Sequence, residues 1–453
     1  MPRRTVVDPQ FHRRLRELRH ACGLSQRMLA EAAYVSKSHI SELESGAKTP
    51  GVATAKALDA ALGADGKLLG LVREDTARSA VNSEDLADRA LQYHSKESDT
   101  LDMILELGRA DVKRRSIVTA PFVLAALAAP SRDWLLASLD AVSDERGPRR
   151  VGMEQVAGIR DMFALFQEMD VMRGGGHART ALVEYLNSYV LPLVRRDHGN
   201  EKVQRAMYEA ASEQAYLVGW MAYDDGLHGL AERYLIQALR LAEASGSRTL
   251  GAHVLAGMSD QANLLGNPGE ALMLARAGRR GITVEESPAC MADLQVLEAR
   301  ALAALGDRAA AARAVVDAER TFARVEPTGE PEWARFIDPA YVFGEAAHCF
   351  RDLEDVAQIE RFATESVEAA SRQQRARRGA LSYAALATSY LIKQEPEAAA
   401  TIGQKVIDLT ARVRSSRCHE TVRDLAARFA PYAGIAEVDN FLDRASQRLT
   451  HDR

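Results

Sequence analysis

Apolar residues recur at intervals of three and four along almost the whole chain, which is the spacing of one face of an α-helix. Near the N-terminus, for example, Phe11, Leu15 and Leu18 form such a stripe. Runs in which apolar and polar residues alternate one by one, as they do in strands, are nearly absent. The pattern therefore predicts an all-α protein with almost no sheet.

The N-terminal part of the chain carries the start and stop signals of five short helical segments. Gly23, Gly46 and Gly63 follow apolar stripes, where a residue that tolerates a positive φ ends a helix. Ser25 and Ser36 stand just before the next stripes and are expected to be N-caps. The expected segments are a first helix before Gly23, then Gln26–Ala33, Lys37–Leu43, a fourth around Ala55–Leu62, and Gly66–Val72.

The second and third segments are joined by a short turn, which is the geometry of a helix-turn-helix. In the second segment, Met28, Leu29 and Ala32 are expected to face the core. The strings GLSQRMLA, VSKSHISELESG and LDAALG resemble the XRE family of helix-turn-helix regulators, the type of Cro and the phage repressors. Tyr34 departs from the pattern, because the family usually has glycine at that turn. The alternative is a helical bundle that only mediates protein contacts.

The resemblance implies a recognition helix whose N-terminal residues meet base edges, while the preceding helix crosses the phosphates. Lys37 is then suited to guanine O6 and N7, whereas serine reads bases weakly. One such module buries too little surface for tight binding, so a dimer on a palindromic operator in double-stranded DNA is expected. The DNA-binding candidates are Lys37, Ser38, Ser41 and, marginally, His39 at base edges, with Ser25, Gln26, Arg27, Ser36 and Lys48 at the backbone.

The composition agrees with a folded, helical chain. Of 453 residues, 47% are hydrophobic and 27% charged, which excludes wholesale disorder and a polytopic membrane protein. Residues 1–72 hold 11 Lys and Arg against 7 acids, although the net charge of the whole chain is -5. A basic head on an acidic body indicates that only the head meets a polyanion.

No catalytic, metal or cofactor site is expected from the sequence. The four cysteines are far apart, and no HExxH, Walker loop, GxGxxG or Ser-His-Asp order is present in a usable context. Gly174-Gly175-Gly176 lacks the preceding strand and the lysine of a phosphate loop, so we interpret it as a flexible turn between helices. These absences argue against an enzyme.

The segment Lys113–Val118 and the apolar run 117–129 together resemble an export signal. We reject this interpretation, because the segment is internal and 13 apolar residues are too few to cross a bilayer. A cytoplasmic protein without a membrane partner is expected.

From about residue 205 the chain repeats itself with a period of 40. Gly226, Gly266 and Gly306 each end an expected helix, and an alanine follows each of them five positions later. Two less regular units follow. This period indicates an α-solenoid. Its helices are expected at 207–224, 228–245, 249–265, 268–280, 289–305, 307–324, 334–351, 355–371, 376–393, 396–413, 417–430 and 435–449.

The units resemble tetratricopeptide repeats, although that repeat has a period of about 34 residues. The first helix of each pair lines the concave face of such a solenoid, where extended peptides can bind. Trp333, Asp338, Tyr341 and Glu345 form a further cluster, which we assign to packing in preference to a ligand wall. The ligand-groove candidates are Gln214, Tyr223, His253, Gln261, Asn263, Glu298 and Arg300.

An XRE head joined to tetratricopeptide-like repeats resembles the RRNPP-like regulators and the actinobacterial XRE regulators with such repeats. The resemblance implies a cytoplasmic homodimer that regulates transcription in response to a signal peptide or small-molecule effector. The alternative is an interaction scaffold that docks a regulatory protein in the solenoid groove. The expected domains are a helix-turn-helix domain at 8–72, a linker and connecting helix at 73–118, a helical connector at 119–204 and the sensing and dimerising solenoid at 205–450.

Overall fold

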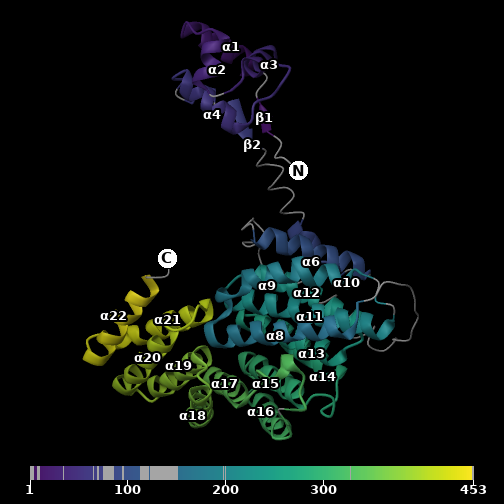
Figure 1. Cartoon of the computed structure of the whole chain (residues 1–453). Coiled ribbons are helices and arrows are strands. Elements are labelled where there is room, and N and C mark those ends of the chain that lie inside the picture. Colours follow the sequence, from purple (N-terminus) through teal and green to yellow (C-terminus); the bar gives the residue numbers. More distant parts are fainter. Residues whose placement is uncertain are drawn as a thin grey trace. The chain divides into compact units, whose positions relative to one another are not determined.

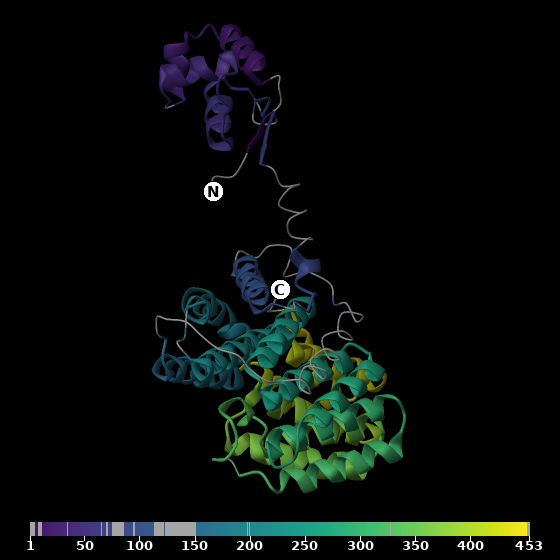
Figure 2. The same cartoon turned by 90° about the vertical axis from the view of Figure 1, so that its right-hand side faces the viewer.

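The computed structural model describes residues 5–7, 11–33, 35–64, 66–68, 71–74, 86–93, 96–112, 122, 151–196, 198, 200–326 and 328–450. The chain divides into two compact units, residues 1–85 and 86–453, which Figures 1 and 2 show in two views. Tyr34, the segment 113–118 and, apart from Phe122, the apolar run 117–129 lie outside the described residues.

Short helices around one small core make up the first unit. Its described elements are β1 (Thr5–Val7), α1 (Phe11–Ala21), α2 (Gln26–Ala32), α3 (Lys37–Ser45), α4 (Val52–Ala61) and β2 (Val72–Glu74). Leu15, Leu29 and Ile40 are completely buried where α1, α2 and α3 meet. The two strands pair antiparallel, with Val7 opposite Val72.

The segment expected as a fifth helix at 66–72 differs in its described part. Residues 66–68 form a turn, and Val72 already belongs to β2. The side chain of Asp59 accepts hydrogen bonds from the N–H groups of Gly66 and Leu68, both at 2.7 Å. These bonds to a side chain favour a turn over a helix.

The buried face of α2 also differs from the prediction. Leu29 is buried as expected, but Met28 is 51% exposed and Ala32 is exposed, so their predicted inward orientation is wrong. Ala30 and Ala33 are buried instead. A helix of two turns is too short for its apolar stripe to define one face, because alanine fits either side.

The second unit is an α-solenoid preceded by additional helices. Helix α6 (Glu97–Val112) packs against α12, and α8 (Met153–Arg173) packs against α11. The short helices α9 (Arg179–Tyr185) and α10 (Leu191–Val194) also contact the first pair. The pairs are α11 (Glu201–Asp224) with α12 (His228–Ser245), α13 (Arg248–Leu264) with α14 (Pro268–Gly281), α15 (Pro288–Ala304) with α16 (Arg308–Phe322), α17 (Pro339–Asp352) with α18 (Val356–Arg372), α19 (Ala376–Ile392) with α20 (Pro396–Thr410), and α21 (Ser416–Phe429) with α22 (Ala436–Thr450).

The helical fold class and the solenoid are thereby confirmed. Most predicted helices agree with the observed ones to within a few residues, and the predicted helix 228–245 coincides with α12. The largest differences are at two helix starts, because α11 already begins at Glu201, before the predicted 207–224, and α17 begins only at Pro339, inside the predicted 334–351. Asp338 caps it by accepting a hydrogen bond from the N–H of Tyr341 at 2.9 Å. No helix in the described ranges is long and apolar enough to cross a membrane.

The end of the solenoid packs against its beginning along what we call the seam, residues 173–176, 221–226 and 414–416. The N–H of Arg414 donates to the carbonyl oxygen of Arg173 at 2.8 Å, and the hydroxyl of Ser415 donates to the Asp224 carboxylate at 2.8 Å. Figure 1 accordingly shows α21 beside the end of α8. These contacts join residues about 190 to 240 positions apart in the sequence.

The glycine triplet lies in the seam. It forms the expected turn between α8 and α9, with Gly174 at φ +86°. A Cβ atom on Gly174 would overlap the carbonyl oxygen of Arg414, and one on Gly175 would overlap the carbonyl oxygen of Met221. Close backbone approach, and not flexibility, therefore requires glycine here.

Candidate functional site

A buried ion pair connects α1, α2 and α3 in the first unit. The Arg19 guanidinium donates two hydrogen bonds to the Glu44 carboxylate, at 2.6 and 3.1 Å, and the Gln26 amide donates a third at 2.8 Å. Burial alone would raise the pKa of Glu44, but the hydrogen bonds from Arg19 and Gln26 hold it below its ordinary value. Glu44 is only 2% exposed, and its ionised carboxylate therefore fixes the orientation of α2 and α3 relative to α1.

Two serine caps define where α2 and α3 begin, as the sequence predicts. The Ser25 hydroxyl accepts a hydrogen bond from the N–H of Met28, and the Ser36 hydroxyl accepts one from the N–H of His39, both at 3.2 Å. The remaining N–H groups of each first turn carry the positive end of the helix dipole. Both helix starts are consequently suited to a phosphate group.

The N-terminal half of α3 presents polar side chains to solvent. Lys37, Ser38 and Ser41 are exposed, whereas Ile40 is buried in the core. Lys37 and Ser41 are four residues apart and so share one face of the helix. His39 is half-buried. The structure thus brings the three principal base-edge candidates together on one accessible surface.

Besides the two serines, the candidates for contacts to the DNA backbone are Gln26, Arg27 and Lys48, and they differ in how they are held. The Gln26 amide is engaged by Glu44, so this residue positions the helix pair. Arg27 pairs with a glutamate on α2 at 3.2 Å, and its side chain is 80% exposed. Lys48 lies 3.3 Å from Glu42, and its side chain is 56% exposed. Exposed pairs contribute only about 0–1 kcal/mol, so Arg27 and Lys48 can exchange a carboxylate for a phosphate at little cost.

All these features lie in one continuous stretch of the chain. Residues 10–71 match the family described as a helix-turn-helix domain. The first unit therefore contains the predicted helix-turn-helix domain, and such a domain indicates a DNA-binding regulator. The match does not extend into the α-solenoid. No curated protein matches the chain.

Three of the predicted groove residues lie inside the second unit and not on an open face. Gln214, His253 and Gln261 are completely buried. The amides of Gln214 and Gln261 donate to carbonyl oxygens of other segments, at 3.0 and 2.8 Å. His253 packs between the rings of Tyr216 and Trp333, and burial lowers its pKa to about 3. These side chains therefore serve the packing of the interior.

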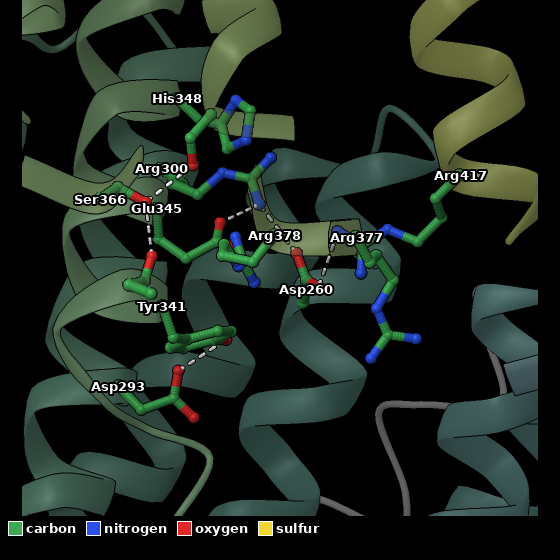
Figure 3. Close-up of polar contacts among 12 residues, drawn as sticks. Asp260, Asp293, Arg300, Tyr341, Glu345, His348, Ser366, Arg377, Arg378 and Arg417 are labelled. Atoms are coloured by element: carbon green, nitrogen blue, oxygen red, sulfur yellow. Dashed lines mark hydrogen bonds and ion pairs between the residues drawn. The ribbon is translucent and has the colours of Figure 1, made fainter. Parts of the chain in front are cut away.

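Two other groove candidates, Tyr223 and Arg300, meet at a buried carboxylate. The Tyr223 hydroxyl donates to Asp260 at 3.1 Å, and Arg300 donates to Asp260 at 2.9 Å and to Glu345 at 2.6 Å. Arg378 donates to the other oxygen of Glu345 at 2.7 Å. Burial would raise the pKa of Glu345, but the two arginines hold it well below its usual range. Figure 3 shows Asp260, Arg300, Glu345 and Arg378 converging in the interior of the unit.

The last two groove candidates do not join this network. Asn263 is half-buried near the end of α13. Glu298, on α15, is 6% exposed and accepts a hydrogen bond from Arg276 of α14 at 2.8 Å. Glu298 therefore pairs with α14, whereas Arg300 on the same helix pairs with Asp260 and Glu345.

Of the predicted cluster, Trp333, Tyr341 and Glu345 are buried and Asp338 is half-buried, and these residues make different contacts. Trp333 is 2% exposed, and the Tyr341 hydroxyl donates to Asp293 at 3.0 Å. Burial raises the pKa of Asp293 to about 8 in spite of this hydrogen bond. Asp293 is consequently mostly protonated near neutral pH. Within the described ranges no group of three His, Cys, Asp or Glu side chains is arranged to hold a metal ion.

Sequence reasoning missed the four arginines at the starts of α19 and α21. Arg375 is the N-cap residue of α19, Arg377 and Arg378 lie in its first turn, and Arg417 is the second residue of α21. Arg377 lies between two buried carboxylates, at 2.8 Å from Asp170 and 2.7 Å from Asp224. Basic residues are disfavoured at the positive end of a helix. An arginine-rich helix start is therefore a sequence signal for buried acidic partners or a bound anion.

Proposed function

We propose that the protein is a sequence-specific DNA-binding transcription regulator of the XRE type, and not an enzyme. The observation that carries this proposal is the exposed face of Lys37, Ser38 and Ser41 on a helix held in place by the buried Arg19–Glu44 pair. A recognition helix needs both properties, because its side chains must reach base edges from a fixed orientation.

In this proposal Lys37, Ser38 and Ser41 contact base edges, with His39 at the margin of the surface. Arg27, Lys48 and the helix starts at Ser25 and Ser36 contact phosphates, and Gln26 orients the pair of helices. The domain boundaries at 8–72 and 205–450 belong to the same proposal, with cytoplasmic DNA as the partner.

The α-solenoid is proposed to dimerise and to sense a peptide or small-molecule signal, as in regulators with tetratricopeptide-like repeats. A dimer would place two recognition helices on a palindromic operator. An effector changes DNA affinity only through its different affinities for two arrangements of the dimer, and a coupling of about 1–3 kcal/mol is typical.

The DNA-binding role is tested by comparing Lys37→Ala with Lys48→Ala. Lys48→Ala removes a proposed phosphate contact, so it should weaken binding to all sequences and reduce the slope of log affinity against log salt by about one unit. Lys37→Ala removes a proposed base contact, so it should change which sequences are preferred in a selection from random DNA.

Lys67→Ala is the control, because Lys67 is exposed in the turn after α4. Its selected sequences should equal those of the unaltered protein. If Lys37→Ala also selects the same sequences with the same affinity, α3 does not read DNA in the proposed way. Binding without any sequence preference would favour a scaffold that docks a protein partner.

A further inference from the structure

We propose that the interior of the α-solenoid binds a small organic anion, a carboxylate or phosphate monoester that carries a flat apolar body. The proposal rests on the sensing role proposed above and specifies the chemistry of the signal. The pocket lies among α8, α11, α19, α21 and the segment before α17, all within the second unit.

The charged lining of this pocket is predominantly basic. Arg375, Arg377, Arg378 and Arg417 line it, whereas Asp170 is its only acidic lining residue among those described. The other carboxylates that pair with these arginines are not part of the lining. The pocket surface therefore presents guanidinium groups, which recognise carboxylate and phosphate through planar pairs of N–H donors.

Arg417 is the member of this set whose hydrogen bonds are unmade. It is 9% exposed, and the nearest carboxylate oxygen, on Asp260, is 3.7 Å away, which is beyond hydrogen-bond distance. Its guanidinium lies over the rings of Tyr223 and Trp220, at 4.7 and 5.9 Å from their centroids. Figure 3 shows it reaching inward from α21.

Guanidinium N–H groups that no protein acceptor engages are available to a ligand, because each can donate a hydrogen bond to an anionic oxygen. The described residues supply Arg377 with a carboxylate acceptor at 2.8 Å and Arg378 with one at 2.7 Å. They supply Arg417 with none. An anion in the pocket would provide the missing acceptor.

Two helix starts add to the positive potential. Helices α19 and α21 both begin at this pocket, since Arg375 and Arg377 lie at the start of one and Arg417 at the start of the other. Each is long enough to carry a substantial dipole, with 17 and 14 residues. The N-terminal ends of such helices favour negative charge.

The walls and the size of the pocket specify the rest of the ligand. Tyr216, Trp220 and Phe336 line it, with the Trp220 ring centroid 6.2 Å from that of Tyr216 and 6.3 Å from that of Phe336. The cavity of about 30 Å³ has room only for a compact anionic head. A more open pocket of about 520 Å³ shares Phe336 and Arg375 with it. We place the flat body in this second pocket, where Phe336 can stack on it.

Calorimetric titration of the full chain with phenylacetate, phenyl phosphate and the neutral phenylacetamide tests the proposal. Both anions should bind, and the amide should bind at least about tenfold more weakly, because it lacks the charge that the arginines recognise. If only one anion binds, the result identifies the head group as carboxylate or phosphate. Equal binding of acid and amide, or no binding of either anion, would overturn the proposal.

Arg417→Gln should lower the affinity for the anions by about tenfold or more, because it removes the charge and most of the N–H donors. Arg428→Gln is the matched control, since Arg428 lies on the same helix and forms an exposed pair with Asp424. Arg417→Lys, which keeps the charge at the same position, should fold and bind with intermediate affinity. Equal affinities of the Arg417→Lys and Arg428→Gln proteins would contradict a role for the guanidinium.

These titrations contain no DNA, so they separate the pocket from its regulatory role. Anion binding that depends on Arg417 but leaves operator affinity unchanged would support the pocket and contradict sensing. If the anions fail to bind but the DNA affinity responds to other signals, the anion site is overturned and the proposed regulatory function stands.

Discussion

Replacing Glu44 by glutamine should destabilise the helix-turn-helix domain strongly. The change keeps the shape of the side chain but leaves Arg19, whose side chain is 9% exposed, without its counter-charge. Removing one partner of a buried ion pair lowers the free energy of unfolding by about 3–5 kcal/mol. Because glutamine keeps one oxygen that can accept a hydrogen bond from Arg19, we expect a loss of about 2–4 kcal/mol. In a domain of this size that loss lowers Tm by on the order of 10–25 °C.

The three tryptophans, at positions 134, 220 and 333, lie outside the first unit. Tryptophan fluorescence therefore follows the second unit, while hydrogen exchange in peptides from residues 11–45 follows the first. The control is Glu42→Gln, because the Glu42 side chain is 48% exposed and its pair with Lys48 should contribute no more than about 1 kcal/mol. Equal exchange protection in the two variants would refute the structural role of the Glu44 carboxylate.

The same pair predicts how the first unit responds to acid. The pKa of Glu44 is lower in the folded protein than in the unfolded chain, so its stabilising contribution is fully present above the ordinary carboxyl pKa of about 4.3. That contribution is lost as the pH falls through the lower, folded-state pKa. Exchange protection that falls equally with acid in the Glu44→Gln protein would contradict the assignment to Glu44.

Two further predictions concern the second unit. Gly175→Ala should destabilise it by about 1–3 kcal/mol, because the added Cβ overlaps the Met221 carbonyl oxygen. Gly158→Ala is the control at an open position of α8 and should be neutral or stabilise by up to about 1 kcal/mol. Equal urea midpoints of the two variants would contradict the close packing at the seam. The unaltered protein should lose stability as the pH rises from about 4 to about 8, and the Asp293→Asn protein should not show this loss. The native carboxyl, with its pKa raised to about 8, stabilises fully below its unfolded pKa and loses this contribution as the pH rises. An unchanged pH profile would exclude Asp293 as the group responsible.

The sequence predicts helix positions well because the signals for helix ends are local. Ser36 caps α3 through its own neighbouring backbone, and Gly226 and Gly266 end helices by adopting a positive φ. Burial depends on partners that are distant in sequence. Met28 lies on a stripe that fits two orientations of a short helix, and its exposure is decided by where α3 and α4 pack against α2.

The interior of the solenoid could not be predicted for the same reason. Gln214 and Gln261 look like groove residues in a pattern of polar positions, yet segments elsewhere in the chain cover them. The pairing of Arg377 with Asp170 joins residues 207 positions apart. Only the arginines at the start of α19, where a helix disfavours positive charge, indicate in the sequence that such partners exist.

Genome-wide DNA capture with the purified full chain, beside the Lys37→Ala protein and the Lys67→Ala control, is the decisive test of sequence-specific DNA binding. We expect a palindromic sequence enriched near a few promoters, lost or altered with Lys37→Ala and retained with Lys67→Ala. Uniform, salt-sensitive capture without a shared sequence, the same in all three proteins, would contradict a sequence-specific regulator.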